Sequence, residues 1–78
     1  MKGQFDATVL KQIESEVRTI KAEYRGRLSE ESIDRVAGES MDLLADSRVP
    51  QFVPLFVGRF TRERLRELVT AEKEARAS

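Results

Sequence analysis

The sequence predicts an all-α protein, a three-helix bundle with helices at about residues 6–25, 30–46 and 50–70, paired as a dimer. Two observations predict the helices. Apolar residues return every three or four positions in three separate segments, which is the spacing of one face of an α-helix. Between these segments stand Gly, Ser and Pro residues of the kinds that end or begin helices. The alternative of a strand at Val49 to Val57 is weaker, because that segment contains two prolines and does not alternate apolar with polar residues.

The first helix is predicted from five apolar residues that recur in steps of three and four, namely Leu10, Ile13, Val17, Ile20 and Tyr24. This spacing is typical of a helix that packs along another helix. Asp6 has the side chain of an N-cap residue. Gly26 suits the left-handed position just beyond the end of a helix.

The second helix is expected to begin after Ser29, which is a favourable N-cap residue. Glu30 and Glu31 follow it, and their charges suit the positive end of the helix dipole. From Ile33 to Leu44 the apolar residues again return at helical spacing. Gly38 and Ser40 lie within this helix and favour the close approach of a neighbouring helix.

The third helix is expected to begin near Pro50, because a proline disfavours helical dihedral angles at the residue before it, here Val49. Pro54 then falls in the first turn, where a missing amide hydrogen costs least. The charged segment 71–78 at the end of this helix is predicted to fray. Residues 1–78 are thus interpreted as one three-helix domain with a charged tail.

Composition narrows the classes of function. The chain has 78 residues, 14 basic and 14 acidic side chains, no cysteine and no histidine. A domain this short buries only about 60% of the surface of its unfolded chain. Because disulfides and the commonest metal ligands are lacking, oligomerisation is the stabilising device that remains. A cytoplasmic protein without membrane contact is predicted, since no secretory signal and no apolar run of about 20 residues occurs.

The first half of the third helix carries more apolar surface than one packing contact covers. Successive residues lie about 100° apart, so its apolar side chains spread over an arc of roughly 200°. Two neighbouring helices are not expected to cover such an arc completely, and an exposed patch of this size marks an interaction site. The predicted dimer interface consists of Phe52, Val53, Leu55, Phe56, Val57 and Phe60. Complete coverage within a monomer remains the alternative.

No catalytic machinery is recognisable, so the chain is interpreted as a protein without enzymatic activity, cofactor or metal. No nucleophile–base pair exists without Cys and His, and the four glycines stand singly instead of forming a phosphate-binding loop. The carboxylate pairs fall on polar helix faces and read as solvated surface. One basic face, made of Arg59, Arg62 and Arg66, gives the alternative of a small nucleic-acid-binding regulator. Nucleic acid is the disfavoured partner, because the net charge is zero and Glu63 can pair with these arginines.

Three stretches of the sequence resemble a known family: Leu28 to Val36, Leu44 to Val57 with its Arg-Val-x-x-Phe-Val-Pro motif, and Arg62 to Leu65. They are similar to the small bacterial three-helix bundle dimerisation domain, which occurs alone or N-terminal to phosphatase-like arsenate reductases. The resemblance covers roughly Leu10 to Leu68. It implies a bundle that pairs with a second copy or with a related domain on such a reductase, with Phe52 to Phe60 as the dimer contact. It does not imply phosphatase or reductase activity, because that chemistry resides in a Cys-bearing loop of a separate domain.

Overall fold

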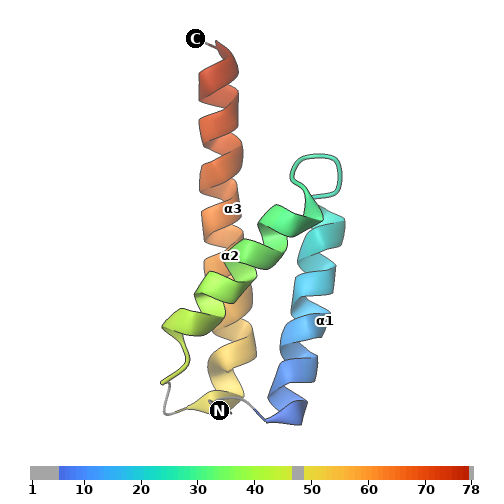
Figure 1. Cartoon of the computed structure of the whole chain (residues 1–78), viewed down its shortest axis with the longest axis vertical. Coiled ribbons are helices and arrows are strands. Elements are labelled where there is room, and N and C mark those ends of the chain that lie inside the picture. The colour runs from blue at the N-terminus through green and yellow to red at the C-terminus, as the bar shows by residue number, and fades with distance from the viewer. Residues whose placement is uncertain (1–5, 47–48, 78) are drawn as a thin grey trace.

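A computed structural model describes residues 6–46 and 49–77 of the chain (Figure 1). In these residues the chain forms three α-helices and one short 3-10 helix: α1 (Ala7–Glu23), α2 (Glu30–Leu43), η1 (Pro50–Phe52) and α3 (Val53–Ala77). No strand occurs in this part of the chain, so the predicted all-α three-helix fold is confirmed. Predictions that involve the segment before Asp6, or Ser47, Arg48 and Ser78, lie outside the described residues.

Helix α1 begins and ends as its flanking residues predict. The backbone amide of Val9 donates a hydrogen bond to the Asp6 carboxylate at 2.9 Å, which makes Asp6 the N-cap. The helix ends at Glu23, two residues before the predicted end, because Tyr24 leaves helical geometry with φ −105° and ψ 14°. Gly26 then adopts a φ of 83°, the left-handed conformation expected there.

Helix α2 is capped by Ser29, whose hydroxyl accepts a hydrogen bond from the amide of Ser32 at 3.1 Å. The predicted end at residue 46 is wrong, because the helix stops at Leu43 and the backbone continues as a turn. Leu44 has φ −103° and ψ 7°, and its amide bonds to the carbonyls of both Ser40 and Met41, at 3.3 and 3.1 Å. Such bifurcated bonding tightens the last turn of a helix.

Helix α3 extends well past its predicted end at residue 70 and is helical as far as Ala77. Residues 71–76 are alanines and long charged residues, which are among the best helix formers. The predicted fraying of 71–78 stays a prediction. From Thr70 to Arg76 every side chain is exposed, and this end of α3 projects beyond the other two helices (Figure 1).

The core lies between all three helices, and α3 is its centre. Helix α3 packs against both α1 and α2, whereas α1 and α2 touch each other over a shorter stretch. The most buried apolar side chains of the core are Ile20, Ile33, Val53, Val57 and Leu65. In this core Thr61 donates a hydrogen bond to the Ser40 hydroxyl, which donates in turn to the carbonyl of Val36 at 3.1 Å. The hydroxyls of Ser40 and Thr61 are therefore both satisfied, and this pair links α2 to α3.

Candidate interaction surface

The predicted interface residues of the third helix divide into three groups in the structure. Val53 and Val57 are fully buried in the chain's own core, so the prediction that they face a partner needs correction. Phe56 and Phe60 are partly buried, and their rings stack with centroids 6.0 Å apart. Phe52 and Leu55 remain 48% and 61% exposed. Helices α1 and α2 thus cover one side of the apolar arc and leave the other side open to solvent.

The exposed apolar side chains gather at one end of the bundle. Among the residues that the structure describes, five large apolar side chains are exposed: Leu10, Leu43, Val49, Phe52 and Leu55. They come from the start of α1, the end of α2, η1 with the residue before it, and the start of α3, and Figure 1 places these segments at the same end of the molecule. We call these five residues the apolar end. Exposed apolar residues scattered singly are ordinary on a protein surface, but their collection at one end marks a candidate contact site.

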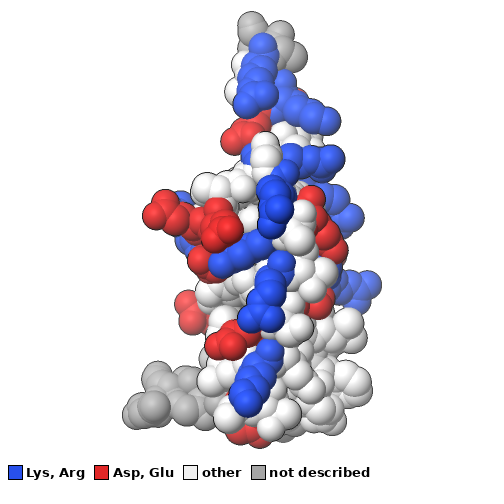
Figure 2. Space-filling model, turned by 90° about the vertical axis from the view of Figure 1, so that its right-hand side faces the viewer, with Lys and Arg blue, Asp and Glu red and all other residues white. Residues whose placement is uncertain are grey.

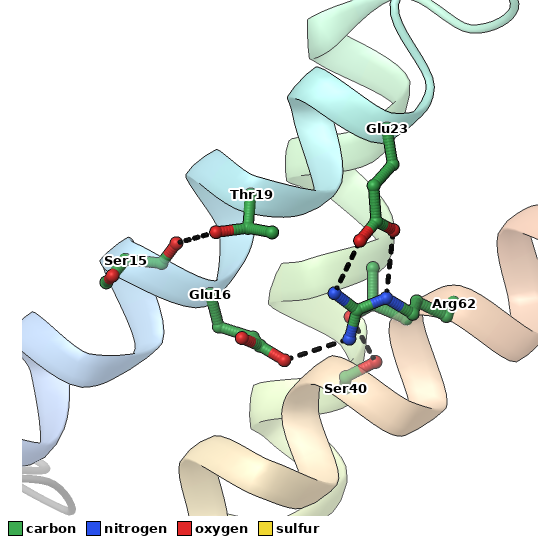
Figure 3. A network of polar contacts seen from close by, with 7 residues as sticks. Ser15, Glu16, Thr19, Glu23, Ser40 and Arg62 are labelled. Carbon is green, nitrogen blue, oxygen red and sulfur yellow. Dashed lines mark hydrogen bonds and ion pairs between the residues drawn. The ribbon is translucent and has the colours of Figure 1, made fainter.

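A polar network joins α1 to α3 on one side of the bundle (Figure 3). Arg62 donates to both carboxylate oxygens of Glu23, each at 3.0 Å, and to Glu16 at 2.9 Å. The hydrogen bonds from Arg62 lower the pKa of Glu23, and those same bonds raise the pKa of Arg62. A bidentate guanidinium–carboxylate pair fixes geometry as well as charge, so this network orients α1 on α3.

Gly58 allows the two helices to approach closely beside this network. It is buried, and a Cβ built at this position would stand 2.7 Å from Cγ of Glu16. A larger residue would therefore push Glu16 away from Arg62. The glycine thus serves the packing of α1 against α3.

The three arginines of the predicted basic face differ in their surroundings. Arg62 is held by the two carboxylates of α1, so its charge is compensated within the chain. Arg59 and Arg66 are exposed, and among the described residues neither forms an ion pair. Among the described residues Glu63 forms no ion pair with these arginines, and one ion pair within α3 joins Arg64 to Glu67 at 3.0 Å. Two exposed arginines remain of the predicted three.

The sequence analysis did not single out Glu16 and Glu23. Their seven-residue separation places them on one side of α1, which was the available signal. The spacing alone does not identify which side of α1 faces α3, because this side is determined by the packing of all three helices. In the described residues, no group of three or more metal-binding side chains converges. None of the described helices is long and apolar enough to cross a lipid bilayer.

Comparison with known families gives one match. Residues 13–69 match the family model of the N-terminal domain of protein-tyrosine-phosphatase-like proteins. The matched range includes most of α1, all of α2 and η1, and α3 as far as Val69. Searches of curated proteins and of solved structures found no significant match.

Proposed function

The chain belongs to the family of N-terminal domains of protein-tyrosine-phosphatase-like proteins, and from this premise we propose that it is a non-catalytic interaction module that pairs with a second copy of itself. The observation that supports the proposal is the apolar end, above all Phe52 and Leu55 at the start of helix three. With a two-fold axis beside this segment, the apolar end of one chain would pack against the apolar end of the second chain. The lack of cysteine suits a reducing compartment, and the proposal places the module in the cytoplasm.

Burial of the exposed apolar side chains stabilises a dimer. Full burial of a Leu or Phe side chain contributes about 1.5–3 kcal/mol, so covering the exposed half of Phe52 and Leu55 contributes about 1 kcal/mol for each. Both copies contribute, and the stacked pair Phe56–Phe60 lies on the same helix. A domain of this size has a small margin of stability, so a gain of this magnitude is significant.

Sedimentation equilibrium at micromolar concentration tests the proposal, and we expect twice the monomer mass of 8.9 kDa. The double variant Phe52→Asp, Leu55→Glu is expected to sediment as a folded monomer, because both side chains are already exposed within the subunit and their replacement leaves the core intact. Circular dichroism checks that the helices are retained.

Thr70→Glu is the matched control for this experiment. It introduces a carboxylate at an exposed position of the same helix, on its projecting half. The control should keep the dimer mass. A wild-type chain that stays monomeric and helical up to millimolar concentration would contradict self-association.

A related domain on a phosphatase-like protein is the second candidate partner, and the name of the family favours it. Mixing the chain with such a domain and measuring the mass of the complex tests this pairing. If the mixed complex forms in preference to the homodimer, the module connects two different chains. The same double variant should abolish it if both partners use the apolar end.

A further inference from the structure

Exposed basic side chains form two rows on the neighbouring helices α1 and α3. In each row seven residues separate one basic side chain from the next, so that all three lie on the same side of their helix. The rows are Lys11, Arg18 and Arg25 along α1 and the turn after it, and Arg59, Arg66 and Lys73 along α3. All six side chains are exposed, and none forms an ion pair with another described residue. Figure 2, which faces α1, shows a line of basic side chains along this side of the bundle.

The two rows belong to one face of the bundle, because the α3 row lies next to α1. Arg62 stands between Arg59 and Arg66 on α3 and reaches across to the carboxylates of α1. Glu16 of α1 borders the same shallow recess as Arg59 and Arg66. We call the surface that extends from the α1 row to the α3 row the two-row face.

Between the two rows, the side chains of α1 are polar and their charges are compensated. Glu16 and Glu23 lie there, and Arg62 binds both. Uncharged hydrogen-bonding side chains are exposed on the same side of α1: Thr8, Gln12, Ser15 and Thr19. Two further carboxylates stand at the edges of the face, Glu14 toward α2 and Glu63 on the far side of α3. The two-row face is therefore basic and able to donate hydrogen bonds across its width.

The two reasons that counted against a nucleic acid partner do not apply to this face. The net charge of zero is an average over the chain, since five exposed carboxylates gather on α2: Glu30, Glu31, Asp34, Glu39 and Asp42. A partner at the surface responds to the local distribution of charge and not to its sum. The other reason was the pairing of Glu63 with the arginines of α3, and no described ion pair joins them.

We propose that the two-row face binds the phosphate backbone of a nucleic acid duplex, independently of its base sequence. Each row extends over about 21 Å, which corresponds to about six base pairs. Lysine, arginine, serine, threonine and glutamine commonly contact phosphate oxygens, and all of these residue types occur on this face. Such contacts position a protein on a duplex and carry no sequence information.

A duplex fits this face better than other anionic partners do. Neutralisation of closely spaced phosphates releases condensed counterions, which favours binding even when every contact is exposed. Exposed ion pairs with an acidic protein contribute little, and the apolar centre of a protein interface is not found between the described residues of the two rows. Insertion into a membrane surface and stacking on single-stranded bases require large apolar or aromatic side chains. Leu55 is an exposed side chain of this kind, and it borders the face at one end.

Fluorescence anisotropy with a labelled DNA duplex of about 20 base pairs tests the proposal on the whole chain. At about 50 mM salt we expect a Kd in the micromolar range, and the same Kd for a duplex of scrambled sequence. If all six basic side chains contact phosphates, the logarithm of Kd should rise with the logarithm of the salt concentration with a slope of about 5.

Removal of two basic side chains from either row should raise Kd about tenfold or more at low salt and lower this slope by about 2. The variant of the α1 row is Arg18→Gln with Arg25→Gln, and the variant of the α3 row is Arg59→Gln with Arg66→Gln. Because all four side chains are exposed, circular dichroism should show unchanged helix content.

Arg35→Gln with Arg64→Gln is the matched control. It removes two exposed basic side chains that border the recess between α2 and α3, outside the two-row face. The control should keep the slope of the wild type and a Kd within about threefold of it. An equal loss for the control and the row variants overturns the proposal, because binding would then follow net charge alone.

Absence of binding to the duplex at low salt also overturns the proposal. Poly-aspartate, or vesicles that contain phosphatidylserine, bound as tightly as the duplex would assign the face to an acidic protein or to a membrane instead. The inference does not depend on self-association, and Arg18→Gln with Arg25→Gln should keep the sedimenting mass of the wild type. Failure of the proposed function is measured by that mass, and failure of duplex binding by the anisotropy.

Discussion

At the scale of single residues, Arg62 is the side chain whose role the sequence misassigned. Its spacing from Arg59 and Arg66 predicted one basic face, because a helix considered alone gives no information about its neighbours. In the bundle, Arg62 turns to α1 and meets Glu16 and Glu23 from a different part of the chain. The positions of the arginines on α3 were thus predictable. The carboxylates that bind Arg62 could not be predicted, because they depend on how α1 crosses α3.

Arg62→Met should destabilise the protein by about 1 kcal/mol at pH 7, since it removes a bidentate pair and a second ion pair that are partly screened by solvent. The difference should shrink at acid pH. Arg62 lowers the pKa of Glu23 below its value in the unfolded chain, so the stabilisation is present above about pH 4.5 and is lost as pH falls through the folded pKa. Urea unfolding at pH 7 and pH 3 measures both effects.

Arg64→Met provides the control for this variant. It removes the exposed pair with Glu67 within α3, and such pairs contribute at most about 0.5 kcal/mol. Equal losses for the two variants at pH 7 would mean that the network between α1 and α3 adds nothing to ordinary surface pairing.

At the scale of elements, the starts of the helices were more predictable than their ends. Asp6 and Ser29 cap α1 and α2 as predicted, because an N-cap is a local hydrogen bond between residues three apart. The predicted ends of α2 and α3 were wrong in opposite directions: α2 stops earlier than predicted, at Leu43, and α3 continues further, to Ala77. No glycine or proline marks either end in the sequence, so the ends depend on turn geometry and helix propensity.

Two glycines should respond oppositely to alanine. Gly38→Ala should stabilise the protein by about 0.5–1 kcal/mol, because Gly38 lies within α2 and a Cβ there meets open space. Gly26→Ala should destabilise it by about 1 kcal/mol, because φ is 83° at that turn. Thermal unfolding of both variants at one low concentration measures the difference. A loss for Gly38→Ala that grows with protein concentration would instead place that residue in a contact between subunits.

At the scale of the whole molecule, the bundle is uneven in both polarity and charge. Its exposed large apolar residues lie at one end, and α2 is acidic outside while α1 and α3 carry most of the basic side chains. The sequence predicted the excess of apolar surface on helix three but not which residues would remain outside. Phe52 is exposed while its neighbour Val53 is buried, since η1 turns the chain just before α3 begins.

If the apolar end pairs two copies, the melting temperature should depend on protein concentration, because a partner that binds only the folded chain stabilises it by mass action. For a domain of this size we expect a rise of roughly 3–6 °C for each tenfold increase in concentration. Calorimetric scans across two decades of concentration measure this. The melting temperature of the variant Phe52→Asp, Leu55→Glu should not change with protein concentration in the lower part of this range.

The length of α3 has a consequence for hydrogen exchange. Its first half packs one side against α1 and α2, whereas from Thr70 to Arg76 its side chains are all exposed. We expect the amide protons of Val57 and Leu65 to exchange when the bundle opens as a whole, and those beyond Thr70 to exchange through local opening of the last turns. One continuous helix should therefore contain both slowly and rapidly exchanging amides.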